Sequence, residues 1–330
     1  MTDARIAVVT AAAARDLDED LSPLADALHE CGQRFDIVNW DDARIDWSRY
    51  DLAVLRSTWD YTTRLHEFLD WAERVSRATR LVNPLDVVRW NTDKHYLGDL
   101  ARAGVATVAS HFIEPGEDAA ALLERFLHKH ETSEFVAKPS VGAGSRDAQR
   151  YGHEERAAAL AHAQRLLDAG RSVLLQPYLD RVDAHGETAA IFFDGAFSHA
   201  IRKGPLLRRG EGPTRALFAA EHITSRTPTA EELRVAQDAL DAIPIGEPAA
   251  ADRPHLSLAR AAGEGGTVRA ANGGVRGKPQ PLLYARVDLI LDGAGKPCVL
   301  ELELTEPSLF FVHADGSAQR FAQAITRRLS

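Results

Sequence analysis

The stretch VLELELTEPSLFF, residues 299–311, decides the fold of this chain. Glu301 and Glu303 are two positions apart on a predicted strand, so both carboxylates lie on one face. The other face is expected to supply the core through the leucines at positions 300, 302 and 304. A buried strand that nevertheless carries carboxylates calls for a chemical reason, which its partner strand provides.

That partner is the segment YARVDLIL, residues 284–291, which a glycine-containing turn joins to the first strand. Such a turn between two alternating segments predicts a β-hairpin. If residues 292–297 form the loop, the expected register has these opposed pairs: Leu291 with Cys298, Asp288 with Glu301, and Arg286 with Glu303.

Like charges directly opposite one another destabilise a sheet. Asp288 facing Glu301 therefore predicts a cation between them, and Mg²⁺ suits a set of carboxylates together with a phosphate. The alternative is a solvated sheet face on which Arg286 and Glu303 form a surface ion pair. The hairpin alone leaves both interpretations open.

The composition is that of a soluble globular protein of two or three domains. The chain has 330 residues, of which 45% are hydrophobic and 26% charged. A formal net charge of −9 argues against a nucleic-acid partner, so any bound anion needs local positive charge. Cys31 and Cys298 give no disulfide framework, and no apolar run approaches the length of a membrane span. We therefore expect a cytoplasmic protein.

The expected fold class is α/β, with three parts along the chain. In residues 1–91, the apolar strands RIAVVT, FDIVNW and YDLAVLRS alternate with helices and predict a parallel sheet. No GxGxxG follows the first strand, so a dinucleotide site is not indicated. Residues 92–179 form the second part, beginning with a helix that Thr92 or Asp93 caps and Gly104 ends.

The last part, residues 180–330, is richer in strands and predicts an antiparallel sheet. Its first hairpin turns at Asp194-Gly195, and the carboxylate hairpin is the second. Residues 244–281 hold seven glycines, five prolines and no aromatic residue, which predicts a flexible insertion. A mobile lid over a site is the competing interpretation.

Three lysines complete a predicted anion-binding set. Lys138 ends a strand and precedes the glycine-containing loop PSVGAGSRD, whose backbone amides suit phosphate oxygens. Lys203 closes the strand SHAIRK, and Lys94 begins the helix NTDKHYLGDL. Each alone is more often a surface lysine. Together with the carboxylate hairpin they provide what the phosphates of ATP require.

The order of these motifs resembles that of the ATP-grasp ligases across nearly the whole chain. It runs from DK before a helix, through a strand ending in lysine and LLQPYL, to a strand ending in RK and the carboxylate hairpin. The segments LRSTWDY, QPYLD, HAIRKGPLLR and ELELTEPSLFF are further similar to the branch that includes the O-ureido-serine cyclo-ligase of cycloserine biosynthesis. The chain departs from the usual pattern at Glu303, where asparagine normally stands, so Glu306 stays open as the third metal ligand.

The resemblance implies roles for the matching residues. ATP would be bound by Lys94, Lys138, the loop residues Gly142, Gly144 and Ser145, the hinge residues Gln176, Pro177, Tyr178 and Leu179, and Asp183 at the ribose. Mg²⁺ would be held by Asp288, Glu301 and Glu303. Phosphoryl transfer would be assisted by Lys203, Arg202 and Arg286, with Arg56 pairing with a substrate carboxylate. For Arg56, the alternative is a structural ion pair.

The activity that the resemblance implies is ATP-dependent activation of a carboxylate as an acylphosphate, followed by attack of a nitrogen. Intramolecular cyclisation of O-ureido-serine to cycloserine is the favoured reaction. Two alternatives are an intermolecular amino-acid ligase and a non-catalytic nucleotide-binding regulator. We expect a small amino-acid substrate as the binding partner, and neither a nucleic acid nor a membrane. The sequence leaves a homodimer open as the assembly.

Overall fold

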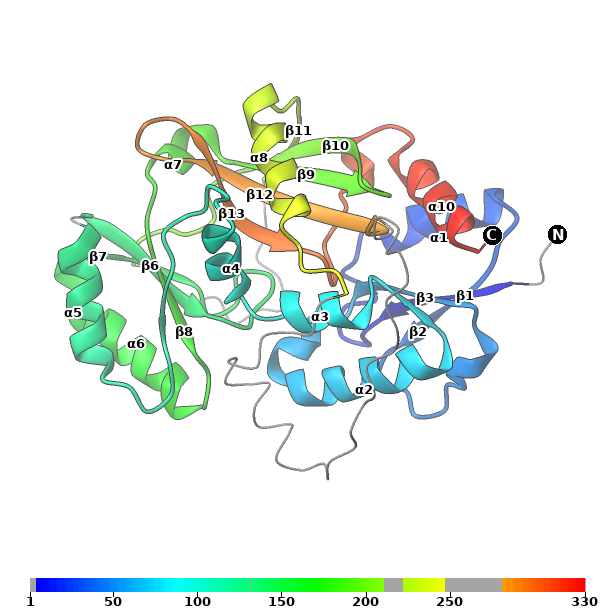
Figure 1. Ribbon diagram of the computed structural model, residues 1–330, viewed down its shortest axis with the longest axis horizontal. Helices are drawn as coiled ribbons and strands as arrows, with labels where there is room; N and C mark the ends of the chain where they lie inside the picture. The colour runs from blue at the N-terminus through cyan, green and yellow to red at the C-terminus, as the bar shows by residue number, and fades with distance from the viewer. Residues whose placement is uncertain (1–3, 131, 211–221, 247–280, 330) are drawn as a thin grey trace, which may run out of the picture.

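The computed structural model describes residues 4–130, 132–210, 222–246 and 281–329. In these ranges the chain forms three sheets, one after another along the sequence (Figure 1). The predicted insertion, 244–281, falls almost wholly outside the described residues. No helix in the ranges given above has both the length and the apolar character that crossing a membrane requires.

The first sheet is parallel, as predicted, because its strands are apolar on both faces. Its order is β2-β1-β3-β4, and β3 is buried at every residue. The strands are β1 (Arg5–Thr10), β2 (Arg34–Asn39), β3 (Leu52–Ser57) and β4 (Arg80–Val82), with helices α1 (Leu21–Glu30) and α2 (Leu65–Ala78) and short 3₁₀ turns η1 (Trp47–Arg49) and η2 (Trp59–Thr63). Ile6 and Val8 pack toward α1, whereas Ala7 and Val9 pack toward α2.

The second sheet is antiparallel, with the order β5-β8-β6-β7. It lies with α5 and α6 at the end of the molecule away from both termini (Figure 1). Its elements are β5 (His111–Ile113), α5 (Ala119–His130), β6 (Glu134–Pro139), β7 (Gln149–Gly152), η3 (His153–Glu155), α6 (Arg156–Asp168), β8 (Val173–Pro177) and α7 (Arg181–His185).

The prediction that a helix begins at Thr92 or Asp93 is wrong, because the helix that ends shortly before Gly104 begins at Tyr96. The chain forms two helices, α3 (Leu85–Asn91) and α4 (Tyr96–Arg102). Between them Asp93 accepts the backbone N–H of His95 at 3.0 Å. An aspartate that binds the backbone two residues on favours a turn rather than a helix interior.

The third sheet is antiparallel, with the order β11-β10-β9-β12-β13. Asp194 and Gly195 both have positive φ, 50° and 75°, as the predicted tight hairpin turn requires. The elements are β9 (Glu187–Phe193), β10 (Ala196–Lys203), β11 (Ile223–Arg226), α8 (Ala230–Asp241), β12 (Tyr284–Leu291), β13 (Pro297–Glu303), η4 (Phe311–His313) and α10 (Ser317–Arg328).

The apolar cores cross the predicted domain boundaries. Trp90 of α3 and Leu97 of α4 pack against Val287 of the third sheet. Phe321 of α10 shares a core with Ile6 of the first sheet. The division at residues 91 and 179 therefore stays a prediction, because the packing joins the parts into continuous cores.

Candidate active site

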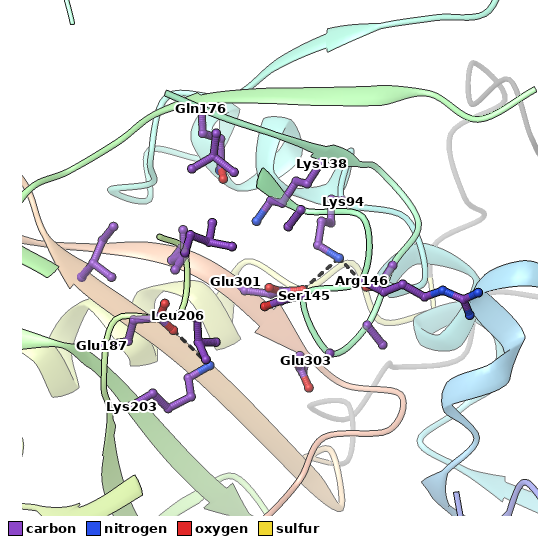
Figure 2. A pocket seen from close by; sticks show the side chains of 18 of the residues that line it. Lys94, Lys138, Ser145, Arg146, Gln176, Glu187, Lys203, Leu206, Glu301 and Glu303 are labelled. Carbon is purple, nitrogen blue, oxygen red and sulfur yellow. Dashed lines mark hydrogen bonds and ion pairs between the residues drawn. The ribbon is translucent and has the colours of Figure 1, made fainter. Parts of the chain in front are cut away.

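A cavity lined by the second and third sheets, with Trp59 of η2 also in its lining, collects most of the predicted site residues. Its lining includes Trp59 from the first part of the chain, Lys138 and Gln176 from the second sheet, and Lys203 and Glu301 from the third. Figure 2 shows lysine ammonium groups on two sides of the Glu301 carboxylate. The site is therefore assembled from segments that are distant in the sequence.

The carboxylate hairpin has the expected register at the site end. Asp288 stands opposite Glu301, and Arg286 stands opposite Glu303. At the loop end the expected register is wrong, because Leu291 pairs with Pro297 instead of Cys298. A register shift between Asp288 and Leu289 separates the two halves, so the strand β13 carries one extra residue, Leu300.

This β-bulge changes the role of Leu300. The leucine was expected to share the core face with Leu302, but it lies half-buried in the cavity lining next to Ile290. Leu302, by contrast, is 1% exposed in the core. The bulge brings an apolar side chain onto the same side of the sheet as Glu301, which gives the cavity an apolar floor beside a charged end.

Every opposed carboxylate of the hairpin has a basic partner in the protein. Lys94 lies 2.9 Å from Glu301, and Lys203 lies 2.6 Å from Asp288. Arg286 reaches both oxygens of Asp288, at 2.9 and 3.0 Å, and also pairs with Glu303. The predicted repulsion between Asp288 and Glu301 is thus relieved by side-chain cations in this structure.

The pKa values of these carboxylates diverge according to their surroundings. Burial opposes the charge of Glu301, but Lys94 and Lys138 hold its pKa at about 2. Burial, together with Glu301 and Asp288, raises the pKa of Glu303 to about 7, although Arg286 opposes this. Burial and the charge of Glu303 raise the pKa of Glu306 to about 8. The carboxylates of the cavity therefore differ in how far neighbouring cations offset the effect of burial on their pKa values.

The predicted phosphate-binding residues border the same cavity. Lys94 Nζ also donates to the carbonyl oxygen of Gly142 at 2.6 Å, which ties the glycine loop to the site. Burial lowers the pKa of Lys138, although Glu301 opposes this shift. Gly144 and Ser145 both have positive φ, 59° and 58°, a backbone geometry that turns the loop sharply. All of these residues line the cavity.

The four hinge residues, Gln176, Pro177, Tyr178 and Leu179, line the cavity where β8 ends. The side chain of Gln176 is fixed by a hydrogen bond to Ser110 Oγ at 3.0 Å. Tyr178 and Leu179 pack in the same apolar cluster as Ile290 and Leu300, and an apolar wall beside backbone polar groups suits a flat heterocycle.

Arg202, which was expected to assist phosphoryl transfer, lies outside the cavity lining. Neighbouring residues of a strand point to opposite faces, so Lys203 enters the cavity and Arg202 does not. Arg202 instead donates to the carbonyl oxygens of His185, at 2.7 Å, and Ala184, at 3.1 Å. It holds the end of α7 in place.

Arg56 and Asp183 also lie outside the cavity lining. Arg56 is 1% exposed and donates to the carbonyl oxygen of Pro307 at 2.9 Å, with Asp20 3.5 Å away. This position matches the structural alternative, and the contact with substrate stays a prediction. Asp183 binds the hydroxyl of Tyr178 and the guanidinium of Arg150, so its ribose contact stays a prediction.

Several lining residues were not predicted as site residues, whereas Glu187 was considered a pocket residue because it is close to the motifs in the sequence. Arg146 follows the glycine loop directly, and its position after Ser145 was the available signal. Glu187 pairs with Lys203 at 3.0 Å across β9 and β10. Ser308 and Phe310 lie beyond the hairpin, where strand alternation no longer predicts which way a side chain points.

Asp288, Glu301 and Glu303 suit a divalent cation by their chemistry, because one buried and two partly buried carboxylates share one hairpin and the pKa of Glu303 is raised. In this side-chain arrangement, no three His, Cys, Asp or Glu residues of the described ranges are grouped closely enough to share a metal. Binding a cation there requires the Lys94–Glu301 and Arg286–Glu303 pairs to open.

The fold and this cavity define an ATP-grasp ligase. The structure matches that of D-alanine–D-alanine ligase from Bacillus anthracis complexed with ATP, with a TM-score of 0.62, 14% identity, and coverage of 99% of this chain and 97% of that one. It matches the ATP-grasp ligase PsnB complexed with a minimal precursor with a TM-score of 0.60 and 16% identity, covering 99% of this chain and all of that one.

The chain belongs to the D-cycloserine synthetase DcsG family. It is 40% identical over 325 residues to the cycloserine biosynthesis protein DcsG of Streptomyces lavendulae, which covers 98% of each chain. The crystal structure of D-cycloserine synthetase DcsG superposes with a TM-score of 0.83 and 38% identity, over 99% of this chain and 100% of that one. Residues 6–83 match the family described as the DcsG N-terminal domain.

Proposed function

We propose that this ATP-dependent ligase converts O-ureido-serine to cycloserine through an acylphosphate. The observation that carries the proposal is one cavity in which Lys94, Lys138 and Lys203 face Glu301 and the hairpin carboxylates. The relationship to DcsG over almost the whole chain supports the substrate. The cavity supports the phosphoryl chemistry independently of that relationship.

ATP would lie with its adenine against the hinge and its phosphates under the glycine loop. Ile290 and Leu300 would contact the adenine ring, and the hinge backbone from Gln176 to Leu179 would bind its polar edge. Lys94 and Lys138 would bind phosphate oxygens, and Asp183 is proposed for the ribose. Because Lys94 holds Gly142, nucleotide binding and loop position would be coupled.

Asp288, Glu301 and Glu303 would hold Mg²⁺ when the nucleotide is bound. The ion would supply charge neutralisation for the phosphate oxygens. Lys203 and Arg286 line the cavity and pair with the buried Asp288, and both would neutralise the transferred phosphoryl group. Neither residue would form a covalent bond, since positioning and charge account for this class of transfer.

The proposed reaction has three steps. A carboxylate oxygen of the substrate forms a bond to the γ-phosphorus, and ADP leaves. The nitrogen bonded to the side-chain oxygen then attacks the acyl carbon, loses its proton, and phosphate leaves as the five-membered ring closes. One water finally cleaves the carbamoyl group from that nitrogen, giving cycloserine and carbamate, which decomposes to carbon dioxide and ammonia.

Ring closure needs no second substrate site, because a nucleophile within the same molecule has a high effective concentration. The competing candidate is an intermolecular ligase, which the shared fold with D-alanine–D-alanine ligase and PsnB keeps open. That reaction would require a separate amine and would release a linear amide.

The test is incubation of the protein with ATP, Mg²⁺ and O-ureido-serine alone, followed by mass spectrometry. Cycloserine and ADP in equal amounts are expected, with no cycloserine when ATP is omitted. ADP release that needs an added amine, together with a linear product, would replace cyclisation by the ligase alternative. Absence of ADP release with every amino acid tried would favour the regulatory alternative.

A further inference from the structure

In the segment that follows the carboxylate hairpin, residues 306–311, most peptide groups form hydrogen bonds with side chains from other parts of the chain. Carbonyl oxygens accept hydrogen bonds as follows: Glu306 from Trp59 at 3.0 Å, Pro307 from Arg56 at 2.9 Å, Ser308 from Arg286 at 3.1 Å, and Leu309 from His199 at 2.8 Å. The amide N–H groups of Leu309, Phe310 and Phe311 donate to Asp20. This fixed backbone also fixes which side chains line the cavity, namely Glu306, Ser308 and Phe310.

Glu306 differs from the other carboxylates of the cavity in its partners. Glu301 pairs with Lys94, Glu187 pairs with Lys203, and Glu303 pairs with Arg286. Within the described part of the chain, Glu306 forms no such ion pair. Its carboxylate is hydrogen-bonded to the hydroxyl of Tyr61, which belongs to η2 beside the first sheet.

A buried carboxyl group that lines a cavity without an ion pair favours its neutral form, and a bound cation would favour the charged form. Glu306 is only 7% exposed, and Trp59 lines the cavity beside it. A carboxylate next to an aromatic ring suits an ammonium group, which is attracted to both.

We propose that Glu306 binds the α-ammonium group of the amino-acid substrate and is oriented by Tyr61. The inference rests on the proposed function for the identity of the substrate, and it adds the selection of α-amino acids over simple carboxylic acids. The ammonium lies one carbon from the carboxyl group that is phosphorylated. Glu306 follows Glu303 by three residues in the same lining, so one small ligand can reach both ends of this segment.

The experiment is calorimetric titration of the protein, saturated with Mg²⁺ and a non-hydrolysable ATP analogue. The two ligands are O-ureido-serine and the same molecule without its α-amino group. The wild-type protein is expected to bind the amino acid on the order of 10- to 100-fold more tightly, the contribution of one charge-assisted hydrogen bond. Glu306→Gln is expected to bring the two affinities within a few-fold of each other.

Two further variants control for indirect effects. Tyr61→Phe removes the orienting hydroxyl and is expected to lose part of the discrimination, with kcat changed less than KM. Glu303→Gln is expected to keep the discrimination while changing the Mg²⁺ dependence of ADP release. Thermal unfolding of each variant shows whether it is folded.

The outcomes separate the two proposals. If Glu306→Gln is folded but still discriminates like the wild type, the ammonium site is refuted while the proposed function stands. A variant whose Mg²⁺ requirement alone changes would make Glu306 a metal ligand instead. If the wild-type protein binds another amino acid but not O-ureido-serine, the proposed substrate fails, and the same comparison with that amino acid and its desamino analogue decides the ammonium site.

Discussion

At the scale of single residues, the neighbouring basic residues Arg202 and Lys203 of β10 point to opposite faces of the sheet. Lys203 is 6% exposed, enters the cavity and contacts Asp288 and Glu187. Arg202 points to the other face and caps carbonyl oxygens at the end of α7. The two residues are adjacent in the sequence motif RK, but successive side chains of a strand point to opposite faces of the sheet, so only Lys203 reaches the cavity.

Changing each of these two basic residues to glutamine tests this separation. Lys203→Gln is expected to lower kcat by roughly 100-fold or more, because a positive charge facing the transferred group is lost. Arg202→Gln should keep most of the turnover and lose roughly 1 to 2 kcal/mol of unfolding free energy, from its two hydrogen bonds. The rate of ADP release and urea unfolding of both variants are the measurements. Equal loss of turnover in both would contradict the assignment.

His95 gives the protein a predicted dependence of stability on pH. Its ring lies between Asp93, at 2.6 Å, and Glu114, at 2.9 Å, and stacks on Phe112. Burial opposes its charge, but the two carboxylates raise its pKa to about 9. A raised pKa means that the protonated ring stabilises the folded state fully below its unfolded pKa, and that this contribution disappears as pH rises through 9.

The free energy of unfolding should therefore fall between pH 7 and pH 10 by roughly 2 kcal/mol more in the wild type than in His95→Gln. Denaturant unfolding at several pH values measures this difference. His66→Gln, at a histidine of the first part of the chain, serves as the control for the substitution itself. A His95→Gln curve parallel to that of the wild type would show that the ring is not protonated in the folded protein.

At the scale of elements, one extra residue in β13 determines which side chains the hairpin of β12 and β13 presents to the cavity. The bulge keeps Asp288 opposite Glu301 while the loop end is shifted by one position. It also places Leu300 in the cavity next to Ile290, whereas Leu302 remains in the core. One hairpin thereby supplies both carboxylates and an apolar surface to the same cavity.

Alanine substitutions at these two leucines should have different consequences. Leu302→Ala opens a cavity in a closely packed core and is expected to cost roughly 2 to 5 kcal/mol of stability. Leu300→Ala should cost much less stability but weaken nucleotide binding by roughly 10-fold, because it removes apolar surface proposed to contact adenine. Thermal unfolding and calorimetric titration with ATP analogues measure the two effects. An unchanged nucleotide affinity in Leu300→Ala would place the adenine elsewhere.

At the scale of the whole molecule, the first and last parts of the chain are locked together. Asp20 precedes α1, but its carboxylate accepts the backbone N–H groups of Leu309, at 2.5 Å, and Phe311, at 2.9 Å. Helix α10 packs against α1 around Phe321 (Figure 1). The wall of the active site is therefore held by a residue almost 290 positions away.

Asp20→Ala is expected to destabilise the protein by roughly 3 to 5 kcal/mol, because buried amides and the Arg56 guanidinium lose their acceptor. Substrate affinity should also fall, since Ser308 and Phe310 line the cavity. Asp16→Ala, at an exposed aspartate of the same loop, is the matched control and should change stability by less than about 0.5 kcal/mol. Equal stability of the two variants would show that the contact is dispensable.

The sequence was sufficient for features that depend on local pattern. Apolar strands separated by helices predicted the parallel first sheet, and Asp194-Gly195 predicted a hairpin turn that the structure confirms. Alternation predicted that Glu301 and Glu303 share a face with Asp288. Motif order predicted the ATP-grasp fold and the family. These properties follow from the backbone period and from turn chemistry, which neighbouring residues encode.

Tertiary structure alone decided the features that depend on distant partners. The bulge at Leu300 breaks the simple strand period, and Arg56 lies in a buried network with Asp20 and Pro307. Glu306 lies past the end of β13, so only the side chains that hold its backbone determine where its carboxylate points. Local periodicity carries no information about contacts across hundreds of residues, because these form only when the three sheets pack together.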